Sequence, residues 1–174
     1  DVSGHGVGSS LLAVSVLNVL SHQTLADTDF HDPAAVMTGL NAVFEMSRHG
    51  GNFFTIWYGV FDVPTRRLTF SGGGHPAPLL LSGDSRASAS TRELEVLGPM
   101  IGLPETVPFE NVSVVLPAFA RMLLYSDGVV EIDQPGGEVA TQDQFVEFVS
   151  GLGSYVEILG RILGRARTLR GQEG

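Results

Sequence analysis

The order of helical and strand-like patterns along the chain is the feature that most constrains its fold. Apolar residues at helical spacing occur over residues 9–22 and in a segment that begins at Asp32 and Pro33. From residue 53 the pattern changes to the aromatic and β-branched residues typical of strands. Helical spacing returns over residues 142–149 and 155–167. Because helices and strands occur in blocks and do not alternate, we predict an α+β layered fold with mostly antiparallel sheet.

The predicted strands fill the middle of the chain. Residues 53–61 and 68–71 are predicted to form a β-hairpin around the turn at residues 64–66. The further short strands are predicted at residues 78–81, 93–97, 112–116 and 121–125. Residues 82–91 are rich in Ser and Ala, which predicts a flexible loop.

The second helix has a start signal that can be read directly. Asp32 is a favourable N-cap, and Pro33 at the first helical position has a backbone angle already suited to the helix. The predicted apolar stripe of this helix consists of Val36, Leu40, Val43 and Phe44.

Length and composition exclude several classes of protein. The chain has 174 residues and a hydrophobic fraction of 43%, so we expect one globular domain that spans residues 1–174. A net charge of −9 argues against a nucleic-acid partner. The absence of Cys excludes disulfides and fits a reducing cytoplasm. No apolar run approaches the roughly 20 residues of a membrane span, and no secretory leader is expected.

Two short motifs carry the chemistry that we expect of this chain. Asp1 opens the run Asp-Val-Ser-Gly-His-Gly, and Asp127 lies in the run Tyr-Ser-Asp-Gly-Val-Val-Glu, which follows an apolar segment. Each motif places a carboxylate before small residues that allow a tight turn. Glu131, four residues after Asp127, would point back toward the same rim if a helix begins near Gly128. Hard divalent cations such as Mg²⁺ and Mn²⁺ prefer oxygen ligands of this kind.

Each motif also has a plain structural interpretation. The Asp1 motif could be a capping turn before the first helix, and Ser-Asp-Gly around Asp127 is an ordinary turn sequence. A nucleotide-binding loop at Gly4, Gly6 and Gly8 is a weaker third interpretation, because its spacing departs from the dinucleotide-binding fingerprint. The joint occurrence of the two acidic motifs favours a metal site.

Five motifs in one order give the chain a family resemblance. They are Asp1–Gly6, Phe54–Asp62, Gly73–Pro78, Gly98–Leu103 and Leu124–Glu131. Together they resemble the SpoIIE/RsbU-type branch of the PPM (PP2C-like) metal-dependent serine/threonine protein phosphatases, over nearly the whole chain. The resemblance implies a β-sandwich flanked by helices, with a centre of two Mn²⁺ or Mg²⁺ ions at one end.

The resemblance also implies a role for each matched residue. Asp1 would bridge both metals, the backbone carbonyl of Val2 would be a further ligand, and Asp127 would bind one metal, so Asp1 and Asp127 are the predicted catalytic residues. The matched residues expected beside these ligands are Gly4, His5, Gly128 and Glu131. His5 could be a general acid, but we interpret it as a structural hydrogen-bonding residue. His75 is expected to shape its loop.

Two parts of the family pattern are missing from this sequence. The family has an acidic ligand in a strand upstream of the first motif, and it ends with an Asp-Asp-x-Thr-like motif, whereas residues 164–174 contain no Asp. The first residue is Asp and not Met. We therefore expect a domain truncated at both ends that is weak or inactive alone, with its missing ligands in a longer parent chain.

The function expected from the resemblance is hydrolysis of phosphoserine or phosphothreonine by water that the metals activate. The expected substrate is a bacterial regulatory protein of the anti-sigma-factor antagonist type, and a sensor domain is expected to precede this region in the parent chain. The alternative is a catalytically impaired PP2C-like module that docks regulatory proteins. The missing ligands favour this alternative, whereas the intact motifs around Asp1 and Asp127 disfavour it.

Overall fold

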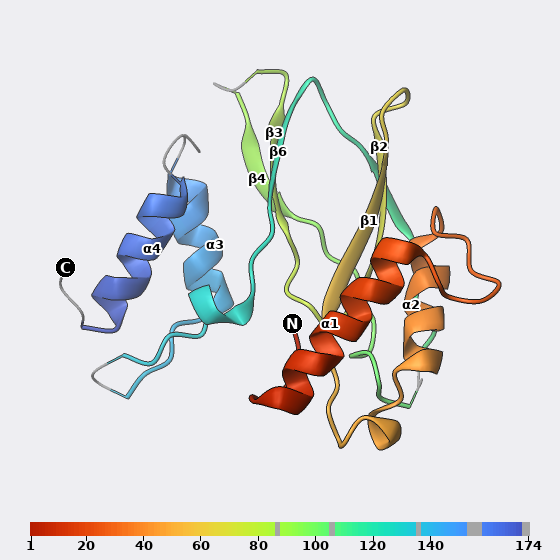
Figure 1. Cartoon of the computed structure of the whole chain (residues 1–174). Helices are drawn as coiled ribbons and strands as arrows, with labels where there is room; N and C mark the ends of the chain where they lie inside the picture. Colours follow the sequence, from red (N-terminus) through yellow and green to blue (C-terminus); the bar gives the residue numbers. More distant parts are fainter. Residues whose placement is uncertain (86–87, 105–106, 135–136, 153–157, 172–174) are drawn as a thin grey trace. The chain divides into compact units, whose positions relative to one another are not determined.

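A computed structural model describes residues 1–85, 88–104, 107–134, 137–152 and 158–171 of the chain (Figure 1). Its α-helices are α1 (Val7–His22), α2 (Pro33–Val43), α3 (Gln142–Gly151) and α4 (Ile158–Leu169). Its strands are β1 (Ile56–Asp62), β2 (Arg67–Gly73), β3 (Leu79–Gly83), β4 (Ser90–Glu93), β5 (Val112–Val115) and β6 (Phe119–Leu123). Short 3₁₀ turns are η1 (Met46–Arg48) and η2 (Asp127–Val129). The predicted α+β class with antiparallel sheets is confirmed.

The chain divides into two compact units. The first unit comprises Asp1–Ala77 and Glu95–Leu116, and the second comprises Pro78–Leu94 and Pro117–Gly174. Within the described residues, each unit has one three-stranded antiparallel sheet and one hydrophobic core. The expectation of a single domain over residues 1–174 stays a prediction.

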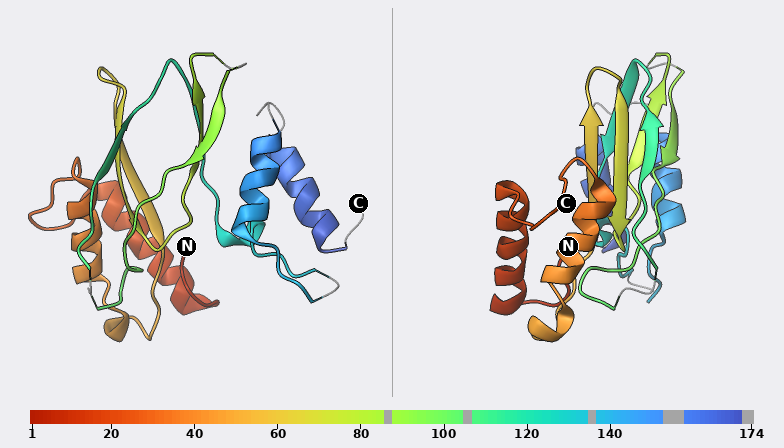
Figure 2. Two further views of the ribbon diagram at one scale, coloured as in Figure 1. Left: turned by 180° about the vertical axis from the view of Figure 1, so that it is seen from behind. Right: turned by 90° about the vertical axis from the view of Figure 1, so that its right-hand side faces the viewer.

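The first unit is built on the sheet β1-β2-β5. The predicted hairpin is confirmed, with Ile56 opposite Gly73 and Asp62 opposite Arg67. α2 packs against β1 and β2, and α1 lies on the same side of that sheet (Figure 2). The buried core residues are Leu12, Val16, Leu25, Phe30, Val36, Met37, Leu40, Phe44, Phe54, Ile101 and Phe109.

The start of α2 confirms the predicted N-cap. The Asp32 carboxylate accepts hydrogen bonds from the backbone N–H groups of Ala34 and Ala35, at 3.1 and 3.2 Å. The predicted apolar stripe is wrong in one position, because the Val43 side chain is exposed at the last residue of the helix. Met37 is completely buried in this helix and contributes to the core that Val43 was expected to join.

The second unit is built on the sheet β4-β3-β6 and on α3 and α4. α3 begins with a capping box: the Thr141 hydroxyl accepts from the Gln144 N–H, and the Gln144 side chain accepts from the Thr141 N–H. The Arg165 guanidinium of α4 lies over the rings of Phe145 and Phe148, at 5.9 and 5.4 Å from their centroids. This cation–π contact ties α4 to α3.

The predicted strand boundaries are wrong at three places in the second unit. Residues 82–91 are not simply a loop, since β3 runs to Gly83 and β4 begins at Ser90. The strand predicted at residues 93–97 ends at Glu93, and the strand predicted at residues 121–125 lies two residues earlier. Pairing with β3 accounts for these shifts, because β3 supplies hydrogen-bond partners from Leu79 to Gly83 whatever the local propensity of its neighbours.

The remaining helix predictions hold with small shifts. α1 begins two residues before the predicted start, and α3 extends two residues beyond its predicted end. α4 runs to Leu169, while residues 155–157 of the predicted last helix lie outside the described residues. None of the helices in the described ranges is both long and apolar enough to cross a membrane.

Candidate functional site

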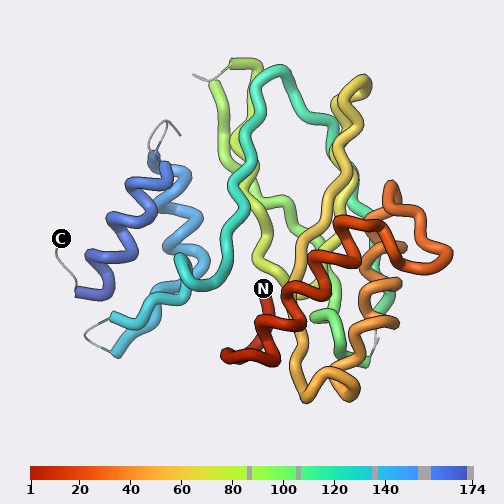
Figure 3. The backbone as a smooth tube through the Cα atoms, in the orientation of Figure 1, coloured from red at the N-terminus to blue at the C-terminus, as the bar shows by residue number. Residues whose placement is uncertain are grey.

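Asp1 is held by backbone pairing with the segment that leads into β1 (Figure 3). The Asp1 nitrogen donates to the Thr55 carbonyl at 2.7 Å, and the Thr55 N–H donates to the Asp1 carbonyl at 2.8 Å. The Ser3 N–H then donates to the Phe53 carbonyl at 2.9 Å. Val2, between these two rungs, is opposite Phe54 in an antiparallel bridge. Because peptide groups alternate along such a ladder, the Val2 carbonyl points away from Phe54.

The same ladder continues on the other edge of Phe54. Phe54 and Ile101 exchange two backbone hydrogen bonds, at 3.1 and 2.9 Å, and both side chains are buried. The Gly98–Leu103 motif therefore supports the Asp1 motif through Phe54, which pairs with both Val2 and Ile101. We call this arrangement of Asp1–Ser3, Phe53–Thr55 and Ile101 the Asp1 ladder.

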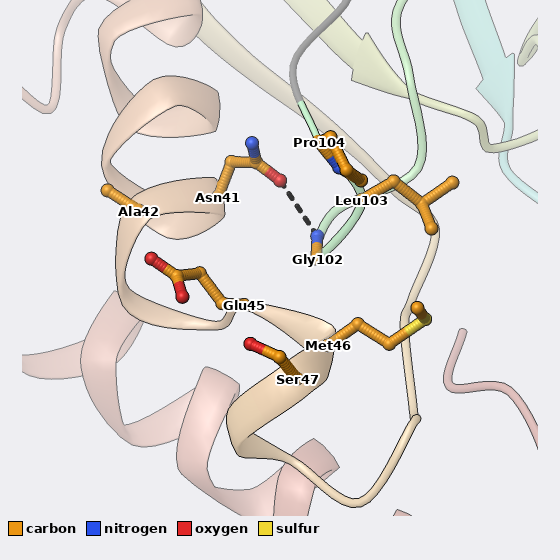
Figure 4. Close-up of a pocket in the computed structure, with 8 residues that line it drawn as sticks. All are labelled: Asn41, Ala42, Glu45, Met46, Ser47, Gly102, Leu103 and Pro104. Carbon is orange, nitrogen blue, oxygen red and sulfur yellow. Dashed lines mark hydrogen bonds between the residues drawn. The ribbon is translucent and has the colours of Figure 1, made fainter.

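Gly102, next to Ile101, is held in a conformation that suits only glycine. Its φ is 105°, and a Cβ added there would lie 2.9 Å from the Phe44 carbonyl oxygen. The buried Asn41 side chain accepts a hydrogen bond from the Gly102 N–H at 2.8 Å, and the Gly102 carbonyl accepts one from the Met46 N–H at 2.9 Å. Figure 4 shows this contact in a pocket of about 400 Å³ between the end of α2 and residues 102–104. These bonds fix the loop that carries Ile101.

The Asp1 ladder also brings His75 beside the acidic motif. The Thr55 hydroxyl and His75 Nδ1 are 2.9 Å apart and share a hydrogen bond. Thr55 is thus bonded to Asp1 through its backbone and to His75 through its side chain. Thr55 was not predicted as a site residue, although it lies in the Phe54–Asp62 motif, because nothing in its local pattern marks a residue that joins two distant segments.

Asp127 begins the 3₁₀ turn η2 in the second unit. β6 ends at Leu123, so three residues outside any strand precede Asp127. The Asp127 carbonyl accepts from the N–H groups of Val130 and Glu131, at 2.8 and 2.7 Å. Its side chain is exposed and forms no hydrogen bond or ion pair with any residue in the described ranges. The turn therefore presents the carboxylate to solvent.

A polar contact between three side chains lies directly before Asp127. The Gln142 side-chain N–H₂ group donates to the Tyr125 hydroxyl oxygen and to the Glu93 carboxylate, each at 3.0 Å. Burial raises the pKa of the Tyr125 phenol to about 12, with a smaller contribution from the Glu93 charge. We call these three residues the Tyr125 clamp. The motif that contains Tyr125 was predicted from the sequence, whereas Glu93 and Gln142 were not predicted to lie near the site.

The structure also places the residues expected beside the ligands. Gly4 has a φ of 79°, and Gly6 caps α1 with a φ of 97°. The His5 side chain between them is exposed, and it forms no hydrogen bond with the rest of the described chain. Its predicted structural hydrogen bond is therefore not seen. Gly128 has no left-handed backbone, and Glu131 is exposed one turn after Asp127.

The chemistry of these donors suits a hard divalent cation. Asp1 and Asp127 are exposed carboxylates, and the Val2 carbonyl faces away from its bridge partner. Among the residues that the structure describes, no group of three or more His, Cys, Asp or Glu side chains could hold a metal ion.

Solved structures define the class of fold. The chain resembles the SiaA PP2C domain of Pseudomonas aeruginosa with a TM-score of 0.75 and 18% identity, over 99% of this chain and 68% of that one. It resembles the RsbU and RsbW domains of Rv1364c from Mycobacterium tuberculosis with a TM-score of 0.69 and 24% identity, over 100% of this chain and 46% of that one. The fold is PP2C-like, as the sequence resemblance predicted.

Sequence comparison then identifies the family. The family described as Stage II sporulation protein E (SpoIIE) matches residues 1–174, and the chain belongs to it. Phosphoserine phosphatase RsbP of Bacillus subtilis is 30% identical over 135 residues, which is 75% of this chain and 32% of RsbP. Phosphoserine phosphatase RsbU of the same organism is 24% identical over 143 residues, which is 82% of this chain and 41% of RsbU. The chain thus spans less than half the length of these curated relatives.

Proposed function

We propose that the protein is a metal-dependent serine/threonine protein phosphatase. The observation that carries this proposal is the match to the SpoIIE family over residues 1–174, with both acidic motifs present. Two similar curated proteins are phosphoserine phosphatases by name. Among similar structures, one is of RsbX in complex with magnesium, and one is of the SpoIIE phosphatase domain presoaked with manganese. These names support a reaction in which water attacks a phosphate monoester.

The residues that would hold two Mn²⁺ or Mg²⁺ ions are Asp1, through its carboxylate, Val2, through its carbonyl, and Asp127. When bound, such a metal pair would lower the pKa of a bound water and neutralise charge on the phosphoryl oxygens. The Asp1 ladder keeps the Asp1 carboxylate and the Val2 carbonyl on one rigid segment. The turn η2 presents the Asp127 carboxylate without a competing cation in the described residues. Glu131 stays a residue proposed to lie beside the ligands.

The proposed substrate is a phosphorylated regulatory protein of the anti-sigma-factor antagonist type, as the similarity to RsbP and RsbU suggests. An acidic chain repels a phosphorylated partner at long range. Bound divalent cations would reverse the sign of the local charge where the phosphate docks. A sensor domain in the longer protein would then control access to this region.

The test is phosphatase activity of the full-length protein toward p-nitrophenyl phosphate and a phosphoserine protein, with and without Mn²⁺. We expect Asp127→Ala to lower the Mn²⁺-dependent kcat/KM by at least about 100-fold, because the variant loses the carboxylate that is proposed to bind the metal. The control is Asp143→Ala, which removes an exposed carboxylate from the first turn of α3. Activity that is insensitive to Asp127→Ala would falsify the assignment.

The alternative function is a catalytically impaired module that binds regulatory proteins. The lack of Asp in residues 164–174, where the resembled family has an acidic motif, is the observation that favours it. This alternative predicts binding of the phosphorylated partner with no turnover of the full-length protein at any Mn²⁺ concentration. Measurable Mn²⁺-dependent turnover would therefore exclude it.

A further inference from the structure

The segment that carries Asp127 depends on side chains for its position. β6 ends at Leu123, and residues 124–126 have no strand partner in the described structure. The nearest buried side chains on either side of Asp127 are Tyr125 and Val130, which are 9% and 3% exposed. The residues between them are exposed or half-buried. The path of the chain through Asp127 is thus set by how these two anchors are held.

Tyr125 is the more specifically held of the two anchors. Its ring lies against Phe145 of α3, with centroids 4.7 Å apart. Its hydroxyl oxygen accepts a hydrogen bond from Gln142 at 3.0 Å, and the second donor of the same amide group reaches Glu93 at the end of β4. An amide NH₂ group carries two hydrogens, so Gln142 can make both bonds at once. The Tyr125 clamp therefore joins the sheet, α3 and the Asp127 segment.

We propose that Gln142 is a positioning residue for Asp127, acting through the Tyr125 hydroxyl. This inference rests on the proposed function, because it assigns Asp127 to metal binding. Apolar packing of the ring against Phe145 resists removal of Tyr125 from the core, but it is non-directional. The hydrogen bond from Gln142 fixes where the phenol oxygen lies, and Asp127 follows only two residues later. In metalloproteins, residues that orient the ligands affect metal affinity about 10- to 100-fold.

The test is Mn²⁺ binding to the full-length protein, measured by isothermal titration calorimetry. We expect Gln142→Leu to weaken Mn²⁺ binding by about tenfold, because it removes the donor and leaves Tyr125 and Glu93 unpaired. Tyr125→Phe should weaken it in the same direction and by less, since the ring contact with Phe145 is kept. Tyr125→Phe also provides the test if Gln142→Leu does not fold.

The matched control is Gln144→Leu. Gln144 is the same residue type in the same helical turn, but its side chain closes the capping box with Thr141 and does not belong to the Tyr125 clamp. Gln144→Leu should lower the melting temperature and leave Mn²⁺ affinity unchanged. The double variant Tyr125→Phe with Gln142→Leu should bind Mn²⁺ no more weakly than Gln142→Leu alone, because the only bond that Tyr125→Phe removes from the Tyr125 clamp is already lost in Gln142→Leu.

Two further results separate this inference from the proposed function. If Asp127→Ala loses Mn²⁺ binding while Gln142→Leu and Tyr125→Phe bind like Gln144→Leu, the positioning role is wrong and the metal assignment stands. If Asp127→Ala binds Mn²⁺ as tightly as the unmodified protein, the metal assignment of Asp127 is wrong and the positioning role falls with it. Loss of affinity in the clamp variants and not in Gln144→Leu supports the positioning role.

Discussion

Asp1 and Asp127 are supported in different ways within their two units. The Asp1 ladder consists of backbone hydrogen bonds that run from Asp1 through Phe54 to Ile101. The Asp127 turn has no such ladder in the described structure, and its preceding anchor is held by the side chains of the Tyr125 clamp. Backbone pairing tolerates many side chains, whereas a side-chain clamp requires particular ones. Substitutions should therefore act on Asp1 through stability and on Asp127 through local geometry.

The largest effect on the Asp1 ladder is expected from Ile101→Ala. Ile101 is completely buried in the core of the first unit, so truncation leaves a cavity and should cost about 2–5 kcal/mol of unfolding free energy. Hydrogen exchange at the Thr55 amide, which donates to Asp1, should become faster as the ladder opens more often. Urea unfolding and amide exchange measure the two effects.

The control for this change is Leu97→Ala. Leu97 precedes Ile101 on the same connection, but its side chain is 91% exposed, so the expected change is within about 0.5 kcal/mol. If Ile101→Ala destabilises the protein and leaves exchange of the Thr55 amide unchanged, pairing with Ile101 does not hold the Asp1 segment in place.

Gly102→Ala should have a smaller effect on the same ladder. A non-glycine residue with this positive φ is strained by about 1–3 kcal/mol, and its Cβ would press against the Phe44 carbonyl oxygen. Gly50→Ala is the matched control, because Gly50 also has a positive φ but no atom lies within 4 Å of its added Cβ. Equal losses of unfolding free energy in the two variants would show that the contact between the added Cβ and the Phe44 carbonyl oxygen does not affect stability.

The local patterns of the sequence predicted elements whose signals are also local. The N-cap at Asp32 was predicted because its bonds reach only two and three residues along the chain. The hairpin of β1 and β2 was predicted because one turn joins its strands. The start of β4, Ser90 and Thr91, was predicted as loop because it continues the Ser-rich residues 82–89, and it becomes strand only through pairing with β3.

The candidate site was predictable only in part, because some of the contacts that hold it join residues far apart in the sequence. The two acidic motifs are continuous in sequence, and the family match confirms the resemblance that they carry. The Tyr125 clamp joins Gln142 to residues 17 and 49 positions away, and no periodicity marks such a polar contact in advance. The Asp1 ladder likewise depends on a backbone bridge between Phe54 and Ile101, which almost any pair of residues other than proline could form.

The smallest expected effect is the alkaline pH dependence that the Tyr125 clamp gives to stability. The folded-state pKa of Tyr125 is raised to about 12 from the ordinary 10.0, because burial and the Glu93 charge disfavour the phenolate. Between these pH values the unfolded chain has lost the phenol proton and the folded chain retains it. The unfolding free energy therefore falls as the pH rises from about 10 to 12 and is unaffected by Tyr125 below that window. Tyr125→Phe should reduce this decrease in unfolding free energy, as measured by urea unfolding across the pH range.

Tyr58→Phe is the matched change in the first unit, where burial also raises the pKa of a tyrosine whose hydroxyl donates to the Phe30 carbonyl. A Tyr125 phenolate that appears near pH 10 in the folded protein would show that the clamp does not bury this hydroxyl, and the contrast between the two supports would then rest on the Asp1 ladder alone.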